Sequence, residues 1–352
     1  MLTRFTRLLP AVVAVTLLAS CGGGTTPNPP KPMGPQTAAQ RFLSTYVDAD
    51  GAVLRKDEHG DVVSEGQAYG MLIAELAGRQ DLARTIWTWT KRHLQRPDGL
   101  LSWNADADGT VRDDASASDA DILAAYALLR YEGPQAASLH QDGRRVAGAV
   151  LDHESAQTPR GPVPLGGPWA VGDQRPKVDP SYWMPGVYTA LARMTGDQRW
   201  TQAATATVAL VDKASGSGKD LPPDWALLDD DGYTPIGSAG NRAQYGADAQ
   251  RLPLWFGYGC SKTAKDIAAR WWGRLGDDSG ALARSVTGTV YNRDTSVVAL
   301  LGGAAAAVAA GDAGAAARLR GEAAETAQAS PTYFGDAWLA LSAGLADGTL
   351  GC

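Results

Sequence analysis

The chain has 352 residues, and 38 Asp and Glu outnumber 32 Lys and Arg, which gives a formal net charge of −6 at pH 7. This balance argues against nucleic acid as a partner and favours a neutral or weakly charged ligand. Aromatic usage is uneven, with 11 Trp and 11 Tyr but 4 Phe. Trp and Tyr combine a flat apolar face with a polar edge, which suits the stacking of sugar rings.

Residues 1–21 are typical of a bacterial lipoprotein signal peptide. Arg4 and Arg7 precede an apolar run that ends in Leu-Ala-Ser-Cys at positions 18–21. Those four residues resemble the lipobox, where cleavage leaves the cysteine, here Cys21, as a lipidated N-terminus. An ordinary secretory signal that carries a cysteine is the alternative. The run is short for a membrane span, so the lipid would be the anchor that holds the protein on a membrane.

Residues 22–36 are rich in Gly, Thr and Pro and predict a flexible tether. Residues 37–352 contain no further linker-like gap, so we expect them to form one catalytic domain. Two cysteines remain after the lipid site, Cys260 and Cys352. Export permits a disulfide that would pin the C-terminus, and the sequence leaves open whether these two pair.

Helical periodicity dominates the domain, and no convincing strand alternation is present. Short Gly and Asp turns join many consecutive helices, which predicts antiparallel hairpins. Six such hairpins closed into a ring would form an all-α (α/α)6 barrel with one helix of each pair buried. The expected helices lie near 37–47, 65–78, 80–95, 118–131, 138–152, 184–195, 197–213, 253–259, 262–274, 295–310, 312–328 and 333–346.

A lone carboxylate opens the second of these helices. Glu65 lies four residues before Tyr69, on the side of the helix that its apolar residues predict to face inward. An acid that points to the core must be neutralised, paired or used. Asp119 stands in the same relation to the apolar stripe of the helix near 118–131, where a plain helix cap is an equally good interpretation.

A third candidate acid is Asp248, in a loop before a helix whose first turn holds Pro253. Arg251 is close enough in sequence to bind this carboxylate. A purely structural ion pair is the alternative interpretation of Asp248 and Arg251.

Together these segments resemble glycoside hydrolase family 8. Residues Ser64–Met71 (SEGQAYGM) look like the family's SEGQGYGM block, residues Ala117–Asp121 (ASDAD) match its A-[ST]-D-[AG]-D signature, and residues Asp248–Arg251 (DAQR) resemble its D-A-x-R block. The resemblance covers most of residues 37–346. It implies an (α/α)6 barrel that hydrolyses a β-1,4-linked polysaccharide with inversion, most simply as an endo-1,4-β-glucanase.

The resemblance also implies roles for individual residues. Glu65 would be the general acid, Asp248 the general base, and Asp119 would bind the sugar at the cleavage subsite. Burial of Glu65 near Asp119 should raise its pKa against the helix dipole and keep it protonated at working pH. The expected substrate-binding residues are Tyr69, Trp103, Tyr182, Trp183, Trp225 and Arg251.

One position departs from the family pattern, and several functions remain open. Ala247 stands where the family usually has an aromatic residue before the base, and Tyr245 is a candidate substitute. The same family contains chitosanases, xylanases and lichenases. A non-catalytic glycan-binding lipoprotein and an (α/α) polysaccharide lyase are the alternatives from other classes. The four histidines have no metal-ligand spacing, so we expect no metal and no cofactor, and we expect a monomer.

Overall fold

The computed structural model describes residues 35–237 and 242–352. The predicted signal peptide and Cys21 lie outside the described residues, and so does the predicted tether up to residue 34. The chain divides into two units, residues 1–31 and 32–352, and all of the described residues belong to the second unit.

All twelve predicted helices are confirmed within the described residues, with ends that differ by two residues at most. Caps explain several of the starts: Ser261, Ser296, Asp312 and Thr332 each accept a hydrogen bond from a main-chain N–H in the first turn of the helix that follows. The helices are α1 (Pro35–Tyr46), α2 (Ser64–Leu76), α3 (Gln80–His93), α4 (Ser118–Arg130), α5 (Ala136–His153), α6 (Pro185–Thr195), α7 (Arg199–Ala214), α8 (Leu252–Gly257), α9 (Lys262–Leu275), α10 (Val297–Ala309), α11 (Ala313–Ala329) and α12 (Tyr333–Ala346).

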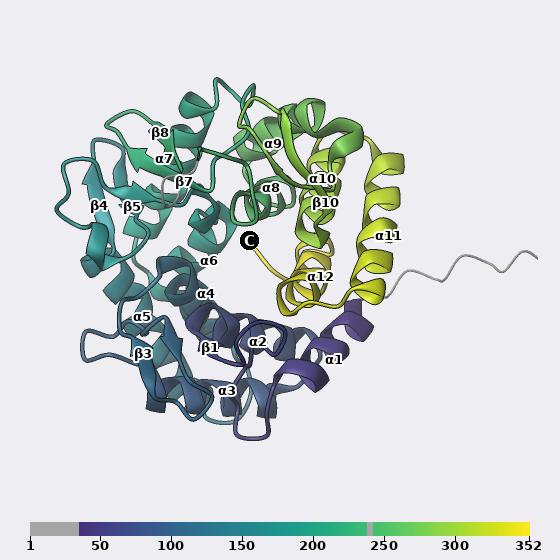
Figure 1. Ribbon diagram of the computed structural model, residues 1–352. Helices are drawn as coiled ribbons and strands as arrows, with labels where there is room; N and C mark the ends of the chain where they lie inside the picture. The colour runs from purple at the N-terminus through teal and green to yellow at the C-terminus, as the bar shows by residue number, and fades with distance from the viewer. Residues whose placement is uncertain (1–34, 238–241) are drawn as a thin grey trace, which may run out of the picture. The chain divides into compact units, whose positions relative to one another are not determined.

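The helices form two concentric rings (Figure 1). Helices α2, α4, α6, α8, α10 and α12 contact one another in that order, and α12 returns to α2 and closes the inner ring. Helices α3, α5, α7, α9 and α11 each pack outside the inner helix that precedes them in sequence. This arrangement is the predicted (α/α)6 barrel.

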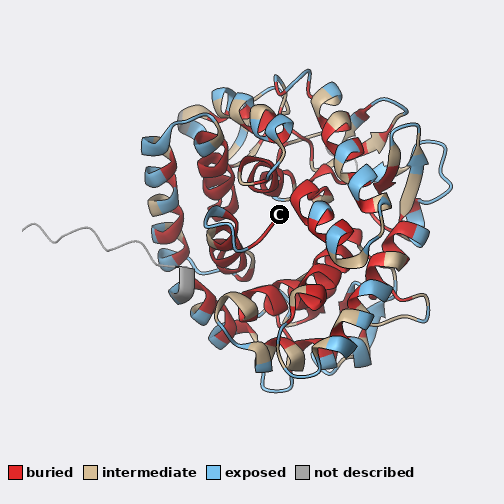
Figure 2. Cartoon of the chain, turned by 180° about the vertical axis from the view of Figure 1, so that it is seen from behind, coloured by how far each residue is buried: buried red, intermediate tan, exposed pale blue. Residues whose placement is uncertain are grey.

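Burial follows the two rings (Figure 2). The inner helices are buried around almost their whole circumference, as in α10, whose sequence VVALLGGAAAAVA carries no charge. The outer helices are amphipathic and keep their polar side toward solvent, as expected for elements with one apolar face. An inner helix that is apolar all round makes any acid on it conspicuous.

The sixth helix pair joins the two ends of the domain. Helix α1 packs on α12, and the Arg41 Nε donates a hydrogen bond of 3.1 Å to the Asp336 Oδ2. The Tyr46 hydroxyl lies 3.4 Å from the same oxygen. The ring therefore closes through a contact between residues almost 300 positions apart in the chain.

The connections also contain strands, although the sequence shows no convincing strand alternation. Short antiparallel strands of two to six residues lie in the connections, and they were missed because so few residues cannot show a period of two. The strands are β1 (Val62–Val63), β2 (Asn104–Ala105), β3 (Val111–Asp113), β4 (Ser155–Thr158), β5 (Gly161–Pro164), β6 (Lys177–Val178), β7 (Trp225–Leu228), β8 (Tyr233–Ile236), β9 (Ala281–Arg284) and β10 (Val290–Thr295).

A disulfide joins Cys260 to Cys352, with the two Cα atoms 6.1 Å apart. The chain end enters the ring, where the Gly351 carbonyl accepts a 2.9 Å hydrogen bond from the Tyr126 hydroxyl. Among the described residues, no helix has the length and apolar content needed to cross a bilayer.

Candidate active site

Glu65 lies in the first turn of α2, at the N-terminal end of the inner ring. Its Oε1 accepts a hydrogen bond of 2.6 Å from the hydroxyl of Tyr69, one helical turn further along. Because residues four apart share one helix face, the local sequence alone sets this pair. The Glu65 side chain keeps 23% of its surface exposed, so it can still reach a ligand.

Asp119 occupies the equivalent place on the neighbouring inner helix α4. Its Oδ1 accepts a 2.8 Å hydrogen bond from the N–H of Ala120, and its side chain is 4% exposed. The residue before α4 is Ala117, whose side chain makes no capping hydrogen bond to the helix. The second oxygen of Asp119 is directed at Arg251.

Arg251 joins the candidate acids into one cluster. Its Nη1 donates to the Glu65 Oε1 at 2.6 Å and to the Asp119 Oδ2 at 3.0 Å. Its Nη2 donates to the Asp248 Oδ1 at 3.1 Å and lies 3.6 Å from the Asp179 Oδ2. The three acids predicted from separate segments therefore meet at one buried guanidinium, which is 4% exposed.

The acids differ in their access to solvent. Asp248 precedes the 3-10 turn at Ala249–Arg251 that leads into α8, and its side chain is 40% exposed. Asp179, to which no role was assigned from the sequence, is fully buried and caps the turn at Pro180–Tyr182 through the N–H of Ser181. An exposed and a shielded carboxyl beside one cation can perform different chemistry.

One guanidinium contacts four carboxyl groups, so the cluster favours protonation of some of them. Burial raises the pKa of Glu65, and Asp248 raises it further, against the lowering effects of Arg251 and of the Tyr69 hydroxyl. Burial and the charge of Glu65 raise the pKa of Asp119 to about 7. The direction of the pKa shift of Glu65 agrees with the prediction, although the carboxylate that adds to the effect of burial is Asp248 rather than Asp119.

An aromatic series leads from this cluster toward solvent. The Arg251 guanidinium lies over the ring of Tyr182 at 5.3 Å, Tyr182 packs against Trp225 at 6.1 Å, and Trp225 packs against Trp169 at 6.1 Å. Trp169 is 47% exposed, and Trp103, directly before β2, is 37% exposed. Trp169 was missed from the sequence, although its Gly-Gly-Pro-Trp context is similar to that of the tryptophans that were selected.

Three aromatic predictions need correction. Trp183 is fully buried, donates its Nε1–H to the Pro164 carbonyl and packs against Tyr233, so it belongs to the core and cannot stack on a sugar. Tyr69 is also fully buried, and it contacts Glu65 rather than a ligand. Tyr245 is fully buried as well and does not replace the missing aromatic at the exposed Ala247. Arg251, likewise predicted to bind substrate, is buried and contacts the acids, and its contact with substrate stays a prediction.

A second pair of buried acids lies behind Asp119. Asp121 accepts a 2.9 Å hydrogen bond from the N–H of Leu101, and Glu154 accepts one of 2.6 Å from the hydroxyl of Ser116. Each has a second oxygen for which the described residues supply no hydrogen-bond partner. Burial raises the pKa of Glu154 to about 8. These acids hold Leu101 and Ser116, both in the connection that precedes the ASDAD motif.

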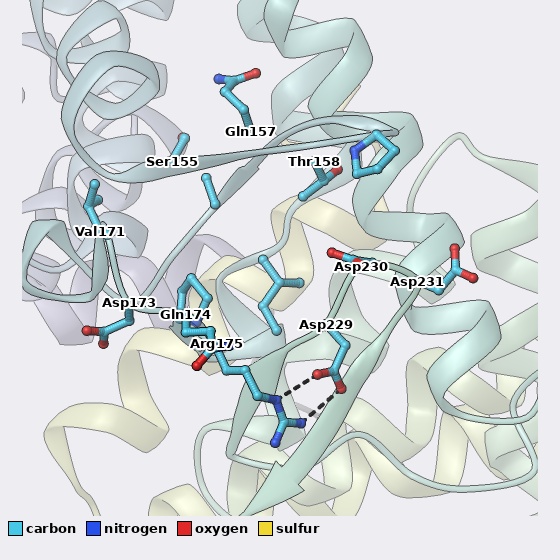
Figure 3. Close-up of a pocket in the computed structure, with 15 residues that line it drawn as sticks. Ser155, Gln157, Thr158, Val171, Asp173, Gln174, Arg175, Asp229, Asp230 and Asp231 are labelled. Carbon is cyan, nitrogen blue, oxygen red and sulfur yellow. Dashed lines mark hydrogen bonds and ion pairs between the residues drawn. The ribbon is translucent and has the colours of Figure 1, made fainter.

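A cavity of about 710 Å³ lies apart from the acid cluster (Figure 3). Its walls are the β4–β5 hairpin, residues 171–176 and the β7–β8 turn, where Arg175 forms a two-bonded ion pair with Asp229. Glu65, Asp119 and Asp248 are not among its lining residues. We therefore place the candidate active site at the acid cluster rather than at this cavity.

The chain is similar to known proteins in both sequence and fold. Residues 11–348 match the family described as glycosyl hydrolases family 8. The chain is 30% identical over 259 residues to a probable endoglucanase of Novacetimonas hansenii, a match that covers 69% of this chain and 74% of the relative.

Two further similarities concern length and fold. Endoglucanase A of Acetivibrio thermocellus is 29% identical over 61% of this chain, but the match spans only 47% of that relative's own length. The solved β-1,3-1,4-glucanase of Paenibacillus sp. X4 superposes with a TM-score of 0.78 at 21% identity, over 90% of this chain and 91% of that one. The second similarity shows a shared fold.

Proposed function

The chain belongs to family 8 of the glycosyl hydrolases, and from that premise we propose that it is an endo-β-1,4-glucanase that cleaves its substrate with inversion. The observation that carries the proposal is the single guanidinium of Arg251, which binds Glu65, Asp119 and Asp248 from three separate segments. The endoglucanase relatives support a β-1,4-glucan as the substrate.

Glu65 is the proposed general acid. Its raised pKa favours the protonated form, which can donate to the leaving glycosidic oxygen. Asp248 is the proposed general base, since its side chain is the most exposed of the four and can reach a water molecule. Asp119 holds the sugar ring between them, and Arg251 fixes the relative positions of the three acids.

The Arg251 contacts set an upper limit on the separation of Glu65 and Asp248, and the range below that limit includes separations that an inverting enzyme needs. The Arg251 nitrogens that bind Glu65 and Asp248 do so at 2.6 and 3.1 Å. With about 2.3 Å between the terminal nitrogens of a planar guanidinium, the two carboxylate oxygens lie within about 8 Å of each other. Inverting glycosidases place their carboxyl groups roughly 6.5–9.5 Å apart so that a water molecule fits between them.

Substrate assays and one variant test the proposal. We expect the purified protein to release reducing ends from carboxymethyl cellulose faster than from xylan, chitosan or mixed-linkage glucan, and to lower the viscosity early, as an endo-acting enzyme does. Proton NMR should detect the α-anomer first. Glu65→Gln should lose hydrolysis but keep its affinity for cello-oligosaccharides. Wild-type turnover in that variant, or inactivity of the wild-type protein on all four polymers, would contradict the proposal.

We also propose that the protein is exported and anchored to a membrane through a lipid on Cys21. The Leu-Ala-Ser-Cys sequence supports this, and the disulfide fits an oxidising compartment. Radiolabelled palmitate should label the wild-type chain, whereas Cys21→Ser should be unlabelled and leave the membrane fraction. Equal labelling of both chains would refute lipidation at this residue.

A further inference from the structure

The segment that carries Asp248 is held in place by its main chain. Residues 244–251 run between the β7–β8 hairpin and α8, and Asp248 lies near the middle of them. Its side chain has the Arg251 guanidinium as its hydrogen-bond donor, and 40% of its surface is exposed. The position of this carboxylate therefore depends strongly on what fixes the backbone around it.

Asp224 provides that contact on both sides of Asp248. Its Oδ1 accepts hydrogen bonds from the N–H of Gly246 at 2.9 Å and from the N–H of Ala249 at 3.0 Å. Its Oδ2 accepts a third from the side-chain amide of Gln244 at 3.0 Å. One carboxylate therefore binds three points of the segment, and its two backbone contacts lie two residues before Asp248 and one residue after it.

Gly246 allows the close approach. A Cβ atom at this position would lie 2.4 Å from the Asp224 Oδ2 and 2.7 Å from the Gln244 Nε2, which is closer than real Cβ contacts allow. Only glycine fits beside the carboxylate without moving it.

The opposite side of the segment is bound to the β9–β10 hairpin. Tyr245 and Arg284 exchange main-chain hydrogen bonds of 2.8 and 3.1 Å, and the Gln250 amide donates to the Leu282 carbonyl at 2.8 Å. These contacts hold residues 245 and 250, whereas the Asp224 carboxylate holds residues 246 and 249, next to Asp248. Asp224 thus anchors the main chain on both sides of the proposed base, while the Arg251 Nε donates to the carbonyl of Asp248 itself at 3.3 Å.

We propose that Asp224 is a positioning residue: it fixes the backbone on both sides of Asp248 and so sets where the proposed base meets its water molecule. This inference rests on the proposed role of Asp248. Asp224 takes no proton from the water itself, because two backbone N–H groups already bind one of its oxygens and the Gln244 amide binds the other. A base displaced by about 1 Å can cost about 100-fold in rate, which sets the expected effect.

Two substitutions separate positioning from direct chemistry. Asp224→Ala removes all three hydrogen bonds, and we expect kcat on cellopentaose to fall about 100-fold with KM nearly unchanged. Asp224→Asn keeps an oxygen for both N–H groups, and its NH2 can donate to a flipped Gln244 amide, so kcat should stay within about fivefold. In contrast, the kcat of Asp248→Asn on cellopentaose should fall more than about 1,000-fold.

An activated leaving group locates the defect. A cello-oligosaccharide with a 2,4-dinitrophenol leaving group needs little general acid, so Glu65→Gln should recover much of its rate on it. Asp224→Ala should show the same loss on this substrate as on cellopentaose, because its defect lies on the side of the attacking water.

Two glycine variants form a matched pair in which Asp224 itself is not substituted. Gly246→Ala should displace Asp224 and lower kcat at least about tenfold. Gly232→Ala, in the β7–β8 turn, brings its Cβ no closer than 3.5 Å to Ala214 and should leave kcat unchanged.

The inference is overturned if Asp224→Ala keeps kcat within threefold of wild type, or if Asp224→Asn is as inactive as Asp248→Asn. Full activity of Asp248→Asn would instead refute the proposed base, so the two failures are distinguishable.

Discussion

Replacement of Arg251 by methionine should destabilise the protein in a manner that depends on pH. Methionine keeps a similar length but leaves Glu65, Asp119 and Asp179 without their shared cation. Breaking a buried ion pair costs about 3–5 kcal/mol of unfolding free energy when the remaining charge stays buried, and we expect that loss at pH 8.

The pH dependence follows from the carboxyl groups. Arg251 lowers the pKa of Glu65 and of Asp119, so its removal raises both further above their values in the unfolded chain. An acid whose pKa is raised by folding stabilises the folded state at low pH, and this contribution disappears as the pH rises toward the raised value. At pH 5 these acids hold protons, so the unfolding free energy lost in Arg251→Met should shrink to about 1–2 kcal/mol.

Urea denaturation of both proteins at pH 5 and pH 8 measures the effect. Arg199→Met is the matched control, because Arg199 is 42% exposed and pairs with Asp197 and Asp152 at the surface. The unfolding free energy of Arg199→Met should lie within about 1 kcal/mol of the wild-type value at both pH values. An equal loss at pH 5 and pH 8 in Arg251→Met would refute the reasoning that the guanidinium compensates buried carboxylates.

Three further outcomes are expected. Burial raises the pKa of Glu154 to about 8. Between pH 5 and pH 8 the folded state therefore keeps a proton that the unfolded chain has released, and the unfolding free energy should fall over this range. Glu154→Gln should flatten that fall by up to about 1.4 kcal/mol per pH unit, and an unchanged slope would contradict the assignment. The double variant Cys260→Ser and Cys352→Ser opens a closed loop with a sequence separation of 92 residues, and thermal or urea unfolding should show a loss of about 2–5 kcal/mol; a stability equal to that of the oxidised wild type would refute it. Trp169→Ala should raise KM for long cello-oligosaccharides about tenfold, equal to about 1.4 kcal/mol of binding, and leave kcat unchanged; an unchanged KM would exclude Trp169 from the binding surface.

The helices could be predicted because each depends on its own sequence. Apolar residues at a spacing of three and four define one face, and Gly or Asp turns mark the ends. The short strands β1–β10 depend on pairing between distant segments, and two to six residues carry too little pattern to show them.

The site was predictable where a motif was specific. Glu65, Asp119 and Asp248 were selected from three blocks, and the structure brings them to one guanidinium. The extent of the Arg251 contacts could not be foreseen, because its partners Glu65 and Asp119 lie 186 and 132 positions away.

Other predictions failed because sequence context does not give the direction of a side chain. Trp183 directly follows Tyr182 at the end of the turn at Pro180–Tyr182, yet Tyr182 is half-buried whereas the side chain of Trp183 is fully buried in the core. Asp224 was given no role for the related reason that its partners are mainly backbone N–H groups, which leave no mark in the sequence.

The pairing of α1 with α12 has a consequence for when the enzyme first becomes active. Every proposed catalytic acid precedes residue 252 in the chain, but Phe334 and Trp338 of the last helix lie against Arg251 and Tyr69, at 5.9 and 5.6 Å. A growing chain therefore carries all its reactive groups before it has the helix that packs against them. Hydrolytic competence should arise only after synthesis is complete, when the two ends of the domain meet.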